Sequence, residues 1–79
     1  MSLRLAENIG TATREARTQA GLCRQQVAEA IGLSLPAYER LERGRLLPGV
    51  TTLCRLAQAL NTSVDVLVGR WPLLPVRAP

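Results

Sequence analysis

The chain has 79 residues, a length that predicts a single domain near the lower limit for folding without a bound metal or disulfides. Ten basic residues, all arginine, against six acidic ones give a formal net charge of +4, which suits a polyanionic partner but does not require one. Two cysteines without a single histidine exclude the ligand spacing of a zinc site, and no apolar run reaches the roughly 18 residues that span a bilayer.

The first predicted element is an amphipathic helix over residues 3–20. Its apolar side chains recur at helical spacing: Leu5, Ile9, Ala12, Ala16 and Ala20. Gly21 then suits a left-handed stop, with Leu22 folding back on the last turn. Gly10 lies inside the helix, where it costs about 1 kcal/mol relative to alanine, so we expect another element to pack closely there. Thr13 is a polar residue on the side expected to face the core.

Two short helices joined by a tight turn are predicted next, over residues 24–31 and about 35–43. Their apolar stripes are Val27, Ala28 and Ile31 in the first, and Tyr38 and Leu41 in the second. Gly32, Leu33 and Ser34 between them supply a turn glycine, an apolar plug and a helix cap. Helices connected so closely must cross steeply, which is the helix-turn-helix arrangement, and its second helix can enter a DNA major groove.

The remaining elements are helices over about 51–60 and 64–68, which follow a loop at residues 45–49. The first helix is expected to bury Leu53, Leu56, Ala57 and Leu60. Asn61 suits a left-handed exit, Ser63 is expected to cap the last helix and Gly69 to end it. Three prolines in residues 70–79 predict a short extended apolar tail after a domain of residues 1–69.

The two cysteines are expected to be reduced thiols, as in cytosolic proteins. Cys23 holds the N-cap position of the helix at residues 24–31, where serine or threonine would cap better. Its place at a helix start beside Arg24 allows a redox switch, but a partly buried inert cysteine is the commoner outcome. Cys54 is expected in or near the core.

Four sequence blocks resemble the Cro/C1-type (Xre-like, lambda-repressor-like) helix-turn-helix DNA-binding family. In chain order they are REARTQAGL, VAEAIGLS, LERGRLLP and TLCRLAQALNTSVDVL. The resemblance covers roughly residues 9–68, and four blocks at the right spacing are far more specific than a lone helix-turn-helix. It implies an all-α fold, a compact five-helix lambda-repressor-like bundle that contains the helix-turn-helix.

The resemblance also assigns roles to particular positions. Arg17 and Glu42 match a buried ion pair, whose disruption would cost about 3–5 kcal/mol. The positions that match DNA phosphate contacts are Arg24, Arg43 and Arg45, and Gln25, which follows Arg24 on the helix, is a further candidate. An arginine fork suits phosphate oxygens well, whereas Gln25 has the alternative of simply facing solvent.

The positions that match base contacts are Leu35, Pro36, Ala37 and Arg40. Arg40 is expected to read guanine O6 and N7, and the alternative is a solvated arginine that pairs with Glu39 or with nothing. The three apolar residues have three open interpretations: contact with thymine methyl groups, docking of another protein, or no role beyond starting the helix.

Relatives of this type often dimerise through the last helix and the segment after it. In this chain the corresponding contacts are Val64, Leu67, Trp71, Leu73 and Leu74. We expect a homodimer with Trp71 in or beside the interface. The alternatives are that the tail folds back on its own protomer or binds another regulatory protein.

The sequence therefore predicts a sequence-specific transcriptional regulator, such as a repressor, that binds a palindromic operator in double-stranded DNA as a dimer. The alternative is an adaptor that uses the apolar start of helix 35–43 for a protein partner. Nothing resembles a catalytic constellation, so we expect no enzyme activity, cofactor or small-molecule ligand. We expect no membrane association and a cytoplasmic, nucleoid-associated location for a protein that is bacterial or phage-encoded.

Overall fold

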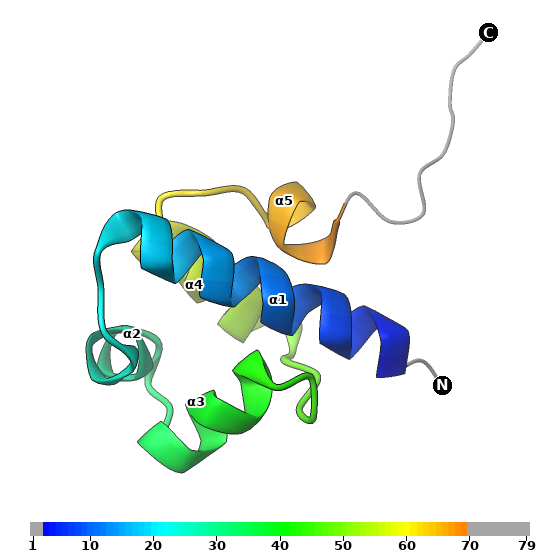
Figure 1. Ribbon diagram of the computed structural model, residues 1–79, viewed down its shortest axis with the longest axis horizontal. Coiled ribbons are helices and arrows are strands. Elements are labelled where there is room, and N and C mark those ends of the chain that lie inside the picture. The colour runs from blue at the N-terminus through cyan, green and yellow to red at the C-terminus, as the bar shows by residue number, and fades with distance from the viewer. Residues whose placement is uncertain (1–2, 70–79) are drawn as a thin grey trace, which may run out of the picture.

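The structure, a computed structural model, describes residues 3–69, which form five α-helices and no strand (Figure 1). The helices are α1 (Leu3–Ala20), α2 (Arg24–Ile31), α3 (Leu35–Glu42), α4 (Val50–Ala59) and α5 (Val64–Val68). The bounds predicted for the first, second and fifth helices are confirmed. The third ends one residue earlier than expected, and the fourth is shifted by one residue. None of these helices is long and apolar enough to cross a bilayer.

Helix α1 runs through the middle of the molecule and organises the other elements around it. It packs against α3 on one side and α5 on the other, while α2 packs against α3 and α4. In Figure 1, α2 is seen nearly end-on whereas α3 lies across the page, so the two helices cross steeply. The predicted helix-turn-helix within an all-α five-helix bundle is therefore confirmed.

Every helix contributes to one apolar core. The largest fully buried side chains are Tyr38, Ile9, Ile31, Leu41, Leu56, Leu67, Val27 and Thr13. Seven of these eight are apolar or aromatic, and Thr13 is the exception that the sequence pattern singled out. Its hydroxyl is buried without a hydrogen-bond partner. Burying such a hydroxyl costs free energy, because its hydration is lost without replacement.

The backbones of α1 and α3 touch at Gly10, as the glycine inside the first helix predicted. A Cβ atom at Gly10 would lie 2.6 Å from the carbonyl oxygens of both Leu41 and Glu42. Only a residue without a side chain fits this approach. Gly10 therefore determines how closely the end of α3, which carries Glu42, lies against α1.

Local sequence signals set the turn between α2 and α3. Gly32 adopts φ +77° after α2, a conformation that favours glycine. The Leu33 amide then donates to the carbonyl of Ala28 (2.9 Å), and Leu33 packs against the core. Ser34 caps α3 by accepting a hydrogen bond from the Ala37 amide at 3.3 Å. The predicted turn glycine, plug and cap are all confirmed.

Three expectations about side-chain burial are wrong. Cys23, for which partial burial was the commoner expectation, is exposed at the start of α2. Cys54 is exposed, because one step along α4 from the partly buried Leu53 turns the side chain by about 100°, away from the core stripe. Ala20 is exposed at the end of α1. The buried surface of α1 instead includes Ala6 and Thr13, because this helix is covered from two sides.

Candidate nucleic-acid interface

The outward side of α3 carries exposed residues at helical spacing. Pro36, Arg40 and the C-cap residue Arg43 are all exposed, and their spacing of four and three residues places them on one face. Leu35 and Ala37 are only partly exposed. Of the four positions expected to face bases, Pro36 and Arg40 are therefore the most accessible.

A concave surface lies beside this face, where α1, the start of α2 and the end of α3 meet. We call it the basic hollow; it has a volume of about 680 Å3. Its arginines are Arg14, Arg24, Arg43 and Arg45. Its other lining residues are Thr11 and three carboxylates, Glu7, Glu39 and Glu42. Three of the four residues expected to contact phosphates thus share one surface with Arg14, which the sequence analysis did not select.

The fourth expected phosphate contact, Gln25, lies elsewhere on α2. It is exposed, and its amide nitrogen donates to a carboxylate oxygen of Glu29 at 2.9 Å, one helical turn away. Gln25 does not line the basic hollow. Its neighbour Gln26 has a structural role that the sequence analysis missed, since its side-chain oxygen accepts from the Cys23 amide at 2.8 Å. This bond satisfies a free amide at the start of α2, and a glutamine three residues after an N-cap is the signal for it.

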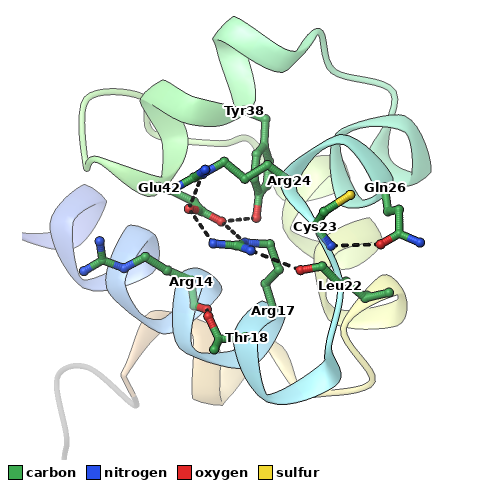
Figure 2. A network of polar contacts seen from close by, with 9 residues as sticks. All are labelled: Arg14, Arg17, Thr18, Leu22, Cys23, Arg24, Gln26, Tyr38 and Glu42. Carbon is green, nitrogen blue, oxygen red and sulfur yellow. Dashed lines mark hydrogen bonds and ion pairs between the residues drawn. The ribbon is translucent and has the colours of Figure 1, made fainter.

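A buried carboxylate forms the floor of the basic hollow. The Glu42 side chain is only 5% exposed and holds Arg17, whose Nε lies 2.6 Å from Oε2 and whose Nη2 donates to Oε1 at 3.4 Å. The Tyr38 hydroxyl also donates to Oε2, so its buried ring has the partner it requires (Figure 2). Arg17 also donates a hydrogen bond from Nη1 to the carbonyl oxygen of Leu22 at 3.0 Å. The network thus ties α1 to α3 and to the turn before α2.

Arg24 joins the same carboxylate from above. Its Nε lies 3.4 Å from Oε1 of Glu42, while half of its side chain (51%) stays exposed (Figure 2). Within residues 3–69, the two ion pairs of Glu42 are the only ones closer than 4.0 Å. Arg14, Arg43 and Arg45 therefore bring positive charge to the basic hollow that no carboxylate of this region neutralises by direct contact.

The network keeps Glu42 ionised. Burial by itself raises the pKa of the Glu42 carboxyl, but the hydrogen bonds from Arg17 and Tyr38 and the charges of Arg17 and Arg24 outweigh it and lower the pKa overall. The hydrogen bond to Glu42 raises the pKa of Arg17. Burial, together with the bond to Glu42, raises the pKa of Tyr38, so its hydroxyl remains a donor.

The residues expected to form a dimer contact divide into three groups. Leu67 is fully buried in the core, so its side chain is used within the protomer, and Val64 is half-buried against the same core. Trp71, Leu73 and Leu74 lie outside the described residues. Val66, in the same apolar segment as Val64 and Leu67, exposes 47% of its surface beside a second hollow of about 450 Å3 between α1 and α5.

Comparison with known proteins agrees with the observed fold. A helix-turn-helix family model (HTH_3) matches residues 14–67. The chain is 46% identical over 46 residues to the cryptic phage CTXphi transcriptional repressor RstR of Vibrio cholerae. The aligned segment covers 58% of this chain and 41% of that protein. The chain thus spans less than half the length of this relative.

Two solved structures resemble the whole bundle. The clp gene regulator ClgR from C. glutamicum superposes with a TM-score of 0.75 at 34% identity, over 89% of this chain and 96% of that one. The restriction-modification controller protein C.AhdI from Aeromonas hydrophila gives a TM-score of 0.73 at 29% identity, over 78% and 94% of the two chains. With the steeply crossed α2 and α3 and the family match over most of its length, the chain belongs to the Cro/C1-type helix-turn-helix family of transcriptional regulators.

Proposed function

We propose that this protein is a sequence-specific transcriptional regulator that binds double-stranded DNA by inserting α3 into the major groove. The observation that carries the proposal is the gathering of Arg24, Arg43 and Arg45 at one concave surface directly beside the exposed face of α3. Positive side chains that flank a groove-reading helix hold the phosphate backbone and set its register, while the helix reads base edges.

Base recognition is assigned chiefly to Arg40. Its side chain is exposed on the same face as Pro36, and no ion pair within residues 3–69 occupies it. A guanidinium in this position can donate to guanine O6 and N7 together, which discriminates by about 1–3 kcal/mol. Pro36 and the accessible parts of Leu35 and Ala37 supply apolar contact for thymine methyl groups.

A dimer on a palindromic operator is the second part of the proposal. One helix-turn-helix unit covers only a short half-site, so useful affinity requires two units about one helical turn of DNA apart. The exposed Val66 near the end of the described chain, followed by the apolar sequence of residues 70–79, supports an interface at α5. The proposed regulator acts in the cytoplasm, without catalysis or a bound ligand.

Selection from a random duplex pool tests this function, with the enriched duplexes then titrated at two salt concentrations. The expected result is a palindrome whose half-sites lie about one turn apart and contain a guanine at the position that Arg40 reaches. Binding without enrichment and with steep salt dependence would contradict sequence-specific recognition and leave only attraction to the backbone. Absence of binding at low salt would reject the regulator in favour of a protein partner at Leu35, Pro36 and Ala37.

A further inference from the structure

We infer that Arg14 on α1 is a further contact to the DNA backbone, so that a phosphodiester group enters the basic hollow and is held from α1 as well as from α2 and the end of α3. This inference rests on the proposed function and extends its binding surface to a third helix. It assigns the hollow to phosphate and leaves base recognition to the outer face of α3.

The first support is position. Arg14 is exposed and lines the same hollow as Arg24, Arg43 and Arg45, although it lies ten residues before the nearest of them in the sequence. Its carbonyl accepts the Thr18 hydroxyl at 2.8 Å within α1, whereas its guanidinium takes no part in the Glu42 network (Figure 2). The group is therefore available for an external anion.

The second support is the contrast with Arg17, one helical turn further along α1. Arg17 is 13% exposed and is occupied by Glu42 and the carbonyl of Leu22. It does not line the basic hollow and has little surface left for DNA. Two arginines one turn apart on the same helix thus have different surroundings, and only Arg14 is accessible.

The third support is the balance of charge in the hollow. Arg17 compensates Glu42 from below, which leaves two carboxylates, Glu7 and Glu39, against four arginines. An arginine fork matches two phosphate oxygens, and such charge-assisted bonds are strong. Positive charge on a concave wall also concentrates anions near it.

The lining also indicates which kind of phosphate compound fits. Small-molecule sites are lined mainly by apolar and aromatic side chains, whereas every lining residue of the basic hollow is charged except Thr11. No aromatic ring lines it on which a base could stack. A phosphodiester of the DNA backbone, delivered beside α3, fits this surface better than a free nucleotide.

The test compares Arg14→Ala with Arg55→Ala, which removes an exposed arginine of α4 that does not line the basic hollow. Dissociation constants for a random-sequence duplex and for a selected duplex are measured across a salt series. We expect Arg14→Ala to weaken binding of both duplexes roughly tenfold at low salt. We also expect it to reduce the slope of log K against log salt by about 0.9, the value for one phosphate contact. Arg55→Ala should leave the slope unchanged.

Three further measurements separate the possible outcomes. Arg45→Ala serves as the reference for the proposed function: if it loses slope and Arg14→Ala behaves like Arg55→Ala, only the present inference is overturned. If neither Arg45→Ala nor Arg14→Ala loses slope, the proposed function fails as well. Arg14→Lys, which keeps the charge, should retain the slope, and equal melting temperatures of the variants exclude misfolding as the cause.

Inorganic phosphate distinguishes the DNA backbone from a free anion as the occupant. Without DNA, phosphate should raise the melting temperature of the wild type and of Arg14→Ala equally, by a general salt effect. A rise that depends on Arg14 would show that the basic hollow takes free phosphate, which would overturn the assignment to the duplex.

Discussion

Glu42 connects three helices through its side chain. It holds Arg17 of α1, Tyr38 one turn earlier on α3, and Arg24 at the start of α2. The lowered pKa of Glu42 means that its ionised side chain is stabilised more in the folded protein than in the unfolded chain. Stability from this residue is therefore complete above the unfolded pKa, about 4.3 for glutamate, and is lost as the pH falls through the lower folded value.

Replacing Glu42 by glutamine should reduce the free energy of unfolding by about 3–5 kcal/mol at pH 7, because Arg17 is left buried without its counter-ion. Urea denaturation between pH 3 and pH 7 measures this, and the loss of stability at acid pH should be shallower in Glu42→Gln than in the wild type. Glu15→Gln on the exposed side of α1 is the control and should change stability little. Identical acid dependence in Glu42→Gln and the wild type would mean that another carboxylate governs acid unfolding.

Thr13 is a second residue whose environment leads to a clear expectation. Its hydroxyl oxygen is buried and lacks a partner in the described structure, so Thr13→Val should raise the free energy of unfolding by about 1 kcal/mol. Thr18→Val is the matched control, because the Thr18 hydroxyl is exposed and bonded to the carbonyl of Arg14. A loss of stability in Thr13→Val would show that the hydroxyl is satisfied in solution.

At the scale of the elements, the contact between α1 and α3 depends on the absence of a side chain. Helix propensity alone favours Gly10→Ala by about 1 kcal/mol. The added methyl group would, however, meet two backbone carbonyl oxygens at 2.6 Å, and backbone atoms cannot turn aside as a side chain can. The helices must then separate, and the carboxylate of Glu42 moves away from Arg17.

We therefore expect Gly10→Ala to lower the stability by about 1–3 kcal/mol, the usual cost of overpacking. The melting temperature should fall by roughly 4–8 °C per kcal/mol for a domain of this size. Gln19→Ala, at an exposed position near the end of the same helix, should leave it within a few degrees. An unchanged or higher melting temperature for Gly10→Ala would mean that α1 and α3 are further apart than described.

At the scale of the whole molecule, the proposed dimer makes a specific demand on α5. Leu67 is buried in the core of its own protomer. The proposed interface at α5 therefore uses Val66 and the apolar residues after Gly69. The proposed dimer then depends strongly on Trp71, since buried tryptophans often dominate interface energetics.

Sedimentation equilibrium should accordingly find a dimer for the wild type and a dimer dissociation constant raised at least tenfold in Trp71→Ala, which corresponds to about 1.4 kcal/mol. Val50→Ala is the control, because Val50 is 77% exposed at the start of α4, outside the proposed interface. A monomeric wild type, or equal dissociation constants for all three proteins, would contradict this interface.

The sequence by itself determined the helices, the turn and the family. These features depend on neighbours along the chain: Gly32 and Ser34 end and start helices through bonds that span only a few residues, and the apolar stripes repeat locally. The steep crossing of α2 and α3 followed from the shortness of their connection.

The tertiary structure alone decided which distant residues meet. Arg14, Arg24 and Arg45 come from three separate segments, and Arg24 shares Glu42 with Arg17, because the packing of α1 and α2 against α3 brings those segments together. The burial of Leu67 was decided in the same way, since it depends on which neighbouring helices cover α5. The exposure of Cys54, by contrast, follows from its position on α4, one step from Leu53.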